Sequence, residues 1–503
     1  MTTAVSPQIA AGQAIPLPKS RGVYYGGAWH EPNSGRFLDT ISPGTGLSLG
    51  KVADGGADDI DAAVASAKAA FKEWRRVLPL ERAKILRRIA EVLRANAHEL
   101  AMIDAANCGN PVREMVSDAI NAASKMDFFA GFVTEMKGSS IPMGPDVVNF
   151  SVREPIGVVG RIIPFNHPFM FCAGKSAAPL AAGNSVVIKP PEQAPLSSLR
   201  LAELIGGLLP PGVFNVVPGG REAGQRLASH PDVGMIALIG SVPTGRAIMK
   251  AAADTVKPTL LELGGKNALI AYGDADPDEV ADAVIGGMNF TWCGQSCGST
   301  SRAFLNEKIY DAVVSRVKEK IKHFKPGIPT DMATTMGAIV SRTQFDRVMS
   351  YIAASKSEGA ELIAGGGPPS DPSLANGFYI EPTVFAVTAK NRIAREEIFG
   401  PVLGVLKWHD EAQMLAEVND VEYGLTASIW TNDLDTAHRT AMAVEAGYVW
   451  VNEVSKHFLG APFGGFKQSG IGREECFEEM VSFTQEKNIH LKLRPKKLDA
   501  KNA

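Results

Sequence analysis

The first part of the chain alternates apolar and polar residues with the period of an α-helix. Over residues 57–76, apolar residues recur at spacings of four and three, which places them on one face of a helix: Ile60, Val64, Ala67, Phe71 and Trp74. The same spacing recurs over residues 79–104. The pattern therefore predicts a mainly helical first segment.

From residue 156 the pattern changes to short apolar runs that are rich in β-branched residues and end in Gly or Pro. These runs lie at 156–164, 184–190, 213–219 and 233–240. Helical stretches separate them, at about 169–181, 195–207, 220–229 and 243–254. Strands that alternate with helices at this spacing predict βαβ units and a parallel sheet. Uninterrupted apolar strands are typical of a sheet that is covered on both faces.

A second alternating run begins with a strand at 267–273 and a helix at 277–288. It continues with a strand at 302–306, a helix at 307–323 and strands at 378–386 and 402–407. These elements predict a second α/β domain. Two further segments, 139–154 and 483–493, have the alternation of edge strands, which need pairing or covering, so we expect them at oligomer contacts.

Composition narrows the classes of function. A chain of 503 residues is expected to form two or three domains. The net charge of −3, with both signs interspersed, gives no basic face for nucleic acid and no polybasic arm for a membrane. The first 22 residues lack the pattern of a signal peptide, and no apolar stretch reaches the roughly 18 residues that span a bilayer.

The five cysteines are odd in number and widely scattered, which does not indicate a disulfide framework: Cys108, Cys172, Cys293, Cys297 and Cys476. This usage favours a reducing compartment and therefore a cytoplasmic location. Although Cys293 and Cys297 are four residues apart, no His or Cys cluster nearby completes a metal site. We expect no metal.

Candidate chemistry gathers around Cys297, which lies among small residues in the stretch GQSCGSTSR. A free cysteine is more often a small buried apolar residue, so a catalytic role for Cys297 depends on other candidate residues. Asn166 follows a predicted strand, where open α/β sheets bind ligands, and its amide could hold an oxyanion or simply form a turn. Glu262 stands between two leucines; it is either a solvated acid or a base whose pKa is raised by desolvation.

Five motifs together make the chain resemble the aldehyde dehydrogenase superfamily, in its hydrolytic, non-acylating branch. They are PFNHP (164–168), LELGGKN (261–267), GQSC (294–297), EEIFGPV (396–402) and PFGGFKQSGIGRE (462–474), and the resemblance runs from about 25 to 490. It implies an α/β fold with a Rossmann-like cofactor domain, a second α/β catalytic domain and a small β oligomerisation extension. It also implies NAD-dependent oxidation of a small-molecule aldehyde to a carboxylic acid by a homodimer or homotetramer.

On this basis we divide the chain into an NAD-binding domain at 1–135 and 155–260, a catalytic domain at 261–470, and oligomerisation strands at 136–154 and 480–495. The resemblance assigns the catalytic roles as well. Cys297 is the nucleophile, and Asn166 stabilises the oxyanion. Glu262 activates the water that hydrolyses the thioester, and Lys175 matches a lysine of the family's active-site shell.

The cofactor residues follow from the same resemblance. Lys189 and Glu192 match the pair that binds the adenosine ribose. A carboxylate at Glu192 suits two free hydroxyls and repels a 2′-phosphate, which favours NAD over NADP; its alternative is a solvated loop acid. A helix after Gly240 and Ser241 could bind the pyrophosphate. The remaining matched positions are Ile163, Pro164, Phe165, Leu263, Gly264, and the nicotinamide-side Glu397 and Phe399.

The substrate pocket departs more from the resemblance. The expected lining residues are His167, Met170, Gly174, Ser296, His457 and Phe463, with Ser455 and Gly298 beside them. Because some relatives place a Trp where this chain has Gly174, we expect a wider, partly polar pocket that disfavours betaine aldehyde. The two histidines could equally be packed, neutral side chains.

Two other functions remain to be weighed. A CoA-acylating semialdehyde dehydrogenase would use a thiol in place of water, but that branch generally lacks the glutamate that Glu262 provides. A non-catalytic binding protein on the same scaffold would not need Cys297, Asn166 and Glu262 together.

Overall fold

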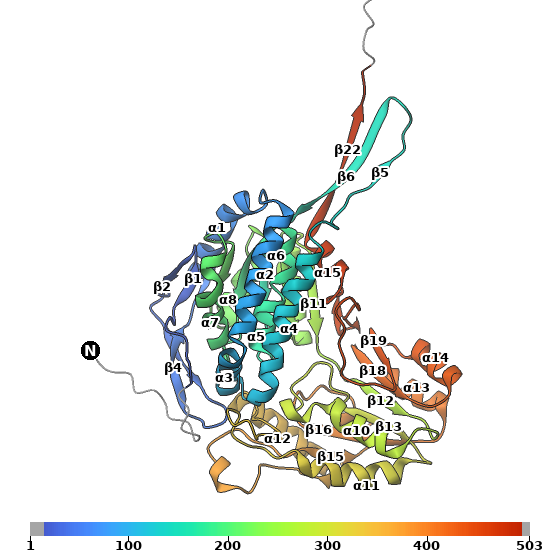
Figure 1. Ribbon diagram of the computed structural model, residues 1–503. Helices are drawn as coiled ribbons and strands as arrows, with labels where there is room; N and C mark the ends of the chain where they lie inside the picture. Colours follow the sequence, from blue (N-terminus) through green and yellow to red (C-terminus); the bar gives the residue numbers. More distant parts are fainter. Residues whose placement is uncertain (1–14, 495–503) are drawn as a thin grey trace, which may run out of the picture.

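Two α/β sheets and a projecting β arm make up the computed structural model, which describes residues 15–494. Two parts of the sequence predictions lie outside the described residues. One is the first 14 residues, where the sequence shows no signal peptide pattern, and the other is residue 495, the end of the second predicted oligomerisation strand. Figure 1 shows the helical first segment against one sheet, with the second sheet below it and the arm extending away from both.

The first sheet has eight strands in the order β2-β1-β9-β8-β7-β10-β11-β21. Their bounds are β2 Ala28–His30, β1 Val23–Tyr25, β9 Phe214–Val216, β8 Ser185–Lys189, β7 Val158–Ile162, β10 Val233–Gly240, β11 Thr259–Leu263 and β21 Gly470–Ile471. The five central strands from β9 to β11 are parallel. The sequence predicted four of them, and β11, which carries Glu262, was not among them. Chain order reverses between β7 and β10, and a doubly wound sheet binds ligands at such a switch point.

Helices cover both faces of this sheet. Neighbouring residues of one strand point into different cores: Val158 packs with α1 (Ala57–Trp74), α8 (Arg221–Ser229) and α9 (Val242–Ala253), whereas Val159 packs with the helices of the other face. Those helices are α2 Pro79–Ala95, α3 Ala97–Cys108, α4 Val112–Gly131, α5 Pro168–Gly174, α6 Ala177–Ala182 and α7 Leu196–Ile205. The sheet is buried on both sides, which explains why its strands are uniformly apolar.

Two predicted helices are each divided in the structure. The run at 79–104 breaks at Asn96, whose side-chain amide donates to the carbonyl of Val92 and competes with the helical pattern. The run at 169–181 breaks at Lys175 and Ser176, since Pro179 has no N–H to donate back to residue 175. Apolar periodicity continues across both breaks, so the pattern alone did not reveal them.

The second sheet has seven strands in the order β14-β15-β16-β13-β12-β18-β19. Their bounds are β14 Glu361–Ala364, β15 Thr383–Ala386, β16 Val402–Trp408, β13 Arg302–Asn306, β12 Ala268–Ala271, β18 Thr426–Trp430 and β19 Tyr448–Val451. Its helices are α10 Pro277–Met288, α11 Tyr310–Lys320, α12 Arg342–Ser357, α13 Glu411–Asn419 and α14 Leu434–Ala443. The predicted strand at 378–386 begins only after Pro382, which cannot donate to a strand ladder.

The arm consists of β5 (Ser140–Ile141), β6 (Val147–Pro155) and β22 (Thr484–Lys492). The alternation of the C-terminal segment predicts an edge strand that needs a partner, and the segment 139–154 of the same chain supplies one. β22 runs antiparallel along β6 of the same chain, from Thr484 opposite Pro155 to Lys492 opposite Val147. The intrachain register satisfies one edge of β22, and its other edge lies at the border of the three-stranded sheet.

The remaining elements are short. β3 (Phe37–Ile41) pairs with β4 (Ser48–Ala53), β17 (Tyr423–Gly424) pairs with β20 (Phe466–Lys467), and α15 (Phe477–Ser482) precedes β22. Across residues 15–494, every helix is too short or too polar to cross a membrane.

Candidate active site

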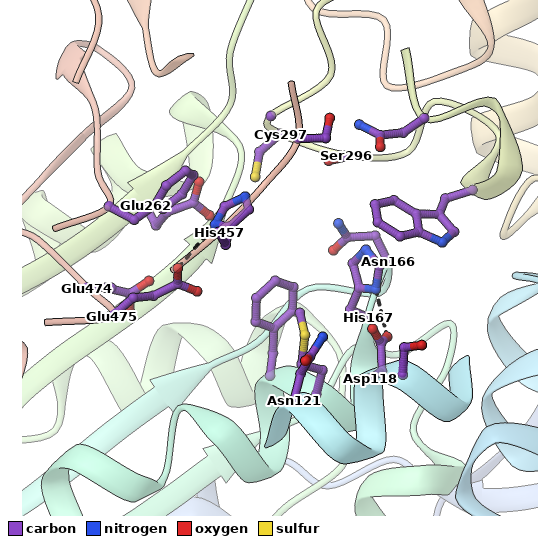
Figure 2. A pocket seen from close by; sticks show the side chains of 18 of the residues that line it. Asp118, Asn121, Asn166, His167, Glu262, Ser296, Cys297, His457, Glu474 and Glu475 are labelled. Atoms are coloured by element: carbon purple, nitrogen blue, oxygen red, sulfur yellow. Dashed lines mark hydrogen bonds and ion pairs between the residues drawn. The ribbon is translucent and has the colours of Figure 1, made fainter. Parts of the chain in front are cut away.

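Three segments that are far apart in the chain meet at one cavity of about 270 Å³. Asn166 follows β7, Glu262 lies on β11, and Cys297 lies in the loop that precedes β13. Figure 2 shows the three side chains around this space. The cavity therefore lies at the carboxyl end of the first sheet, beside the switch point.

The loop that carries Cys297 is held by the second sheet. The Asn267 side-chain amide donates to the carbonyl oxygens of Cys297 and Ser299, at 2.7 and 3.0 Å. The Thr426 hydroxyl donates to the carbonyl of Gly298 at 3.2 Å. These bonds fix the backbone of the loop without contacting the thiol, which borders the cavity beside Glu262.

Cys297 differs from the other cysteines in its exposure. It is half-buried, whereas the other four are fully buried. Cys293 packs among Met336, Ile339 and Val348, in an apolar cluster away from the cavity. Cys293 has a left-handed backbone that ends a short 3₁₀ turn, so it does not lie one α-helical turn before Cys297.

Glu262 is a buried carboxyl in an unusual electrostatic state. It is 4 % exposed, and its Oε1 is buried without a hydrogen-bond partner among the described residues. Burial, and then the negative charge of Glu474, raise the pKa of Glu262 to about 8. Burial and the adjacent Glu262 also raise the pKa of the Cys297 thiol well above its ordinary value. Without a ligand, both groups favour their protonated forms at neutral pH.

Lys175 belongs to a buried ion-pair network that sequence reasoning did not identify. Its Nζ lies 2.8 Å from Oε2 of Glu474, whose Oε1 accepts from Arg161 at 3.1 Å. Arg161 also donates to Glu479 at 3.2 Å. Burial opposes ionisation of Glu474, but Lys175 and Arg161 outweigh it and lower its pKa. Glu474 ends one of the quoted motifs, but nothing in the sequence indicated which residues it pairs with.

Asn166, the candidate donor to the oxyanion, is anchored through its backbone carbonyl. The Asn110 amide donates to the carbonyl oxygen of Asn166 at 2.6 Å. Asn166 is 5 % exposed, and its side-chain Oδ1 is buried without a partner within residues 15–494. A structural turn-forming Asn would bond its side chain locally, and this one instead borders the cavity.

Most of the predicted substrate-side residues line this cavity: His167, Met170, Ser296, His457 and Phe463, with Ser455 and Gly298. Nδ1 of His167 lies 2.7 Å from Oδ2 of Asp118, and Nδ1 of His457 lies 3.1 Å from Oε2 of Glu475. Both histidines are therefore oriented by a carboxylate, as the dashed contacts in Figure 2 show.

Gly174 does not line the cavity, contrary to the sequence prediction. A Cβ at this position would meet Cδ of Lys125 at 3.0 Å and Cα of Ala122 at 3.6 Å. The residue therefore faces α4 and does not open directly onto the cavity. The expectation that it widens the pocket is wrong, because the side chain of Lys125 occupies the adjacent space.

Helix α4 contributes a wall that the sequence analysis missed. Its cavity-lining residues are Glu114, Ser117, Asp118, Asn121 and Lys125. They recur at spacings of three and four, so the stripe was visible in the sequence. A polar stripe on a helix ordinarily faces solvent, and only the packing of α4 against α5 turns it toward a cavity.

The adenosine-side candidates lie at the ends of β8 and β10. Lys189 is buried and donates to the carbonyl oxygens of Pro190 and Gly219, at 2.9 and 2.8 Å. Burial lowers the pKa of Lys189 to about 8, although Glu192 opposes the change. Glu192 itself is exposed. Ser241 precedes α9 but makes no side-chain cap, so the first N–H groups of that helix remain available to an anion.

Some of the remaining cofactor candidates lie beside the loop of Cys297, since a Cβ at Gly265 would come within 2.8 Å of the Cys297 carbonyl oxygen. The rings of Phe165 and Phe399 meet edge to face at 5.6 Å. Oε1 of Glu397 accepts from the backbone N–H of Gly265 at 3.0 Å, and a Cβ at Gly264 would collide with the same carboxylate. The other matched positions lie at the carboxyl ends of β7, β10 and β11: Ile163, Pro164, Gly240 and Leu263. This combination of carboxylates, free helical N–H groups and aromatic rings fits a dinucleotide.

Known proteins resemble the whole chain. The family model described as "Aldehyde dehydrogenase family" matches residues 29–489. Aldehyde dehydrogenase tropH of Talaromyces stipitatus is 50% identical over 486 residues, with 95% of this chain and 94% of that protein covered. Betaine aldehyde dehydrogenase of Sinorhizobium fredii is 41% identical over 470 residues, with 92% and 96% covered.

Solved structures agree in fold. PnpE in complex with nicotinamide adenine dinucleotide has a TM-score of 0.93 and 39% identity, with 95% of this chain and 98% of that chain covered. Indole-3-acetaldehyde dehydrogenase AldA of P. syringae, in complex with NAD+ and IAA, has a TM-score of 0.92 and 37% identity, with the same shares covered.

Proposed function

The chain belongs to the aldehyde dehydrogenase family, and on that premise we propose that it oxidises an aldehyde to a carboxylic acid with NAD, using Cys297 as nucleophile. The observation that carries this proposal is the meeting of Cys297, Glu262 and Asn166 at one cavity, with Glu262 buried. A protein that only binds ligands would gain nothing from a buried carboxyl without an ion-pair partner beside a thiol, because burial of such a group costs stability.

In the first half of the reaction the Cys297 sulfur bonds to the carbonyl carbon, and the carbonyl oxygen becomes an oxyanion. The Asn166 amide and the backbone N–H of Cys297 are the donors that would stabilise this oxygen, and loss of one such donor typically costs about 3 kcal/mol. The thiol gives up its proton to solvent as the carbon–sulfur bond forms. A bound NAD, with Glu397 and Phe399 at its nicotinamide end, would supply the acceptor for the hydride of the thiohemiacetal carbon. Loss of this hydride leaves a thioester on Cys297.

In the second half Glu262 removes a proton from water, and the water oxygen adds to the thioester carbonyl. The carbon–sulfur bond then breaks, the sulfur leaves as the thiolate, and the acid product is released. A base whose pKa is about 8 holds a proton firmly enough to take it from water, and it is still ionised in part at neutral pH. Lys175 is paired with Glu474, whose negative charge raises the pKa of Glu262, whereas the positive charge of Lys175 lowers it.

Glu192 supports NAD as the preferred cofactor. Its carboxylate is exposed at the end of β8, and it lies near Gly220, where a Cβ would come within 3.2 Å of its Oε2. A negative group at this place accepts hydrogen bonds from ribose hydroxyls and repels a 2′-phosphate.

The CoA-acylating alternative is not favoured, because a hydrolytic base is present at Glu262. The test is NADH formation, followed by absorbance, with and without CoA. Hydrolytic oxidation predicts turnover without CoA and a free acid as the product. Turnover that requires CoA would contradict the proposal.

We extend the proposal to the organisation of the chain. The NAD-binding domain comprises 1–135 and 155–260, and the catalytic domain comprises 261–470. The arm, at 136–154 and 480–495, is the oligomerisation element of a homodimer or homotetramer. Its support is the exposed border of β22. A cytoplasmic location remains part of the proposal and is supported by the use of cysteine as free thiols.

A further inference from the structure

A buried lysine stands in the wall of the active-site cavity. Lys125 lies on α4, and its side chain is 8 % exposed. Its Nζ donates to Oε1 of Glu475 at 2.7 Å. An ammonium group has three N–H donors, and in residues 15–494 the structure gives it this one acceptor. The other two N–H groups are available to a molecule in the cavity that Lys125 lines.

Gly174 is what admits Lys125 to this position. Any side chain at residue 174 would begin with a Cβ only 3.0 Å from Cδ of Lys125. That distance is shorter than an ordinary van der Waals contact, so a larger residue on α5 would displace the lysine stem. The glycine and the lysine therefore form a matched pair across the contact between α4 and α5.

Glu475 holds the lysine in place and links it to a second donor. Its Oε1 accepts from Lys125 and its Oε2 lies 3.1 Å from Nδ1 of His457. Its backbone is left-handed, with φ of 65°, and its N–H donates to Glu479 at 2.7 Å. A non-glycine residue rarely adopts this conformation, and the contact with Glu479 helps to keep it there.

Several other charged groups that line the cavity are already in ion pairs. Asp118 is paired with His167, and Glu474 with Lys175 and Arg161. Glu475 lies between Lys125 and His457, so its single negative charge is shared by two groups that carry or accept a proton. Glu114 also lines the cavity on α4, and its Oε1 accepts from Arg113. Lys125 and Lys175 are thus the two buried lysines of this cavity, each with one recorded acceptor among residues 15–494, and Lys125 is the one linked through Glu475 to His457.

We infer that Lys125 selects aldehydes that carry a carboxylate at the end opposite the aldehyde group. The inference rests on the proposed function, since it concerns the substrate of the same cavity. A carboxylate that leaves water needs charged donors to compensate for lost hydration. Lys125 supplies two N–H groups, and His457 lies beside it through Glu475. A purely apolar aldehyde would leave these donors unpaired.

The experiment compares two probes that share one skeleton, para-formylbenzoate and its neutral methyl ester. We expect the wild type to prefer the carboxylate in kcat/KM. Lys125→Met should lower kcat/KM for the carboxylate by about 10- to 100-fold, the range that corresponds to loss of a charge-assisted hydrogen bond. It should leave kcat/KM for the ester within about threefold, because the ester does not depend on the positive charge.

Two further variants separate this role from a structural one. Lys125→Met combined with Glu475→Gln leaves no unpaired buried carboxylate and should show the same loss of preference. Gly174→Ala keeps every charge but pushes the lysine stem, so it should also reduce the carboxylate preference. Lys257→Met is the matched control, since Lys257 is equally buried but donates to the carbonyl oxygens of Ala228 and His230, away from the cavity. It should retain the preference.

An unchanged ratio of carboxylate to ester in both Lys125 variants, with folding verified by thermal melting, overturns the inference. A wild type that oxidises the ester and rejects the carboxylate overturns it too, and leaves the proposed function intact. A wild type that forms no NADH with either probe and acquires no acyl adduct on Cys297 overturns the proposed function, and the inference with it.

Discussion

Replacement of Glu262 by Gln should separate the two halves of the reaction. Glu262 is 4 % exposed, and its pKa is raised to about 8 by burial and by Glu474. Gln keeps the shape of the side chain and removes the base. Hydrolysis of the thioester should therefore slow by about 10²- to 10⁴-fold, the usual contribution of a general base.

The first half should survive this change. The negative charge of Glu262 is one of the causes that raise the pKa of the Cys297 thiol, so a neutral Gln makes thiolate formation easier. The variant should release up to one equivalent of NADH per active site in a fast burst and then stall. Rapid-mixing absorbance measures the burst, and mass spectrometry of the intact protein should find the acyl group on Cys297.

The same substitution should stabilise the fold, with a sign that follows from the pKa. A carboxyl whose pKa is raised on folding destabilises the folded state above its unfolded pKa, and the loss grows until the pH passes the folded pKa. The pKa of Glu262 rises from the ordinary value of 4.5 to about 8 on folding. This rise lowers the free energy of unfolding by about 3 kcal/mol at pH 7 and by about 5 kcal/mol above pH 8. Glu262→Gln should therefore raise Tm, and the increase should be larger at alkaline pH.

The outcome that refutes this reasoning is specific. If the variant binds NAD but gives neither a burst nor an adduct, Glu262 activates the thiol and not the water. Normal steady-state turnover would leave Glu262 without a catalytic role. A Tm that does not rise would show that the carboxyl carries no such cost in the folded protein.

Other expected outcomes concern the nucleophile, the cofactor and the arm. Cys297→Ala should abolish aldehyde oxidation and retain NAD binding, as measured by titration. Cys293→Ala, in the apolar cluster of the second sheet, should keep activity. Turnover of Cys297→Ala within tenfold of wild type would exclude Cys297 as the nucleophile. Glu192→Gln should narrow the NAD to NADP ratio of kcat/KM, and an unchanged ratio would mean that another residue reads the ribose. Truncation after Gln485 removes most of the β22 ladder along β6 and should lower both Tm and the mass seen by light scattering; an intact, equally stable oligomer would exclude the arm from assembly.

Local patterns in the sequence carried much of the fold. Runs such as 233–240 and 302–306 became strands with the predicted bounds, and 277–288 became a helix from Pro277 to Met288. In these segments propensity, apolar period and terminal residues all favour the same element, for example Asp276 as the cap of α10. The helix at 79–104 was less predictable, because a single Asn interrupts the backbone while the apolar period continues.

By itself, the sequence indicated the class of reaction and a candidate nucleophile and base, because these groups lie in short motifs that resemble those of the family: GQSC around Cys297 and LELGGKN around Glu262. Only the tertiary structure decided what surrounds them. The pairing of Lys175 with Glu474, and of Lys125 with Glu475, joins residues about 300 or more positions apart. Burial and charge act through space, so a glycine expected to widen the pocket proved to be the place where a distant lysine packs. For the same reason, the C-terminal strand, whose alternation showed only that it needs a partner, found that partner within its own chain.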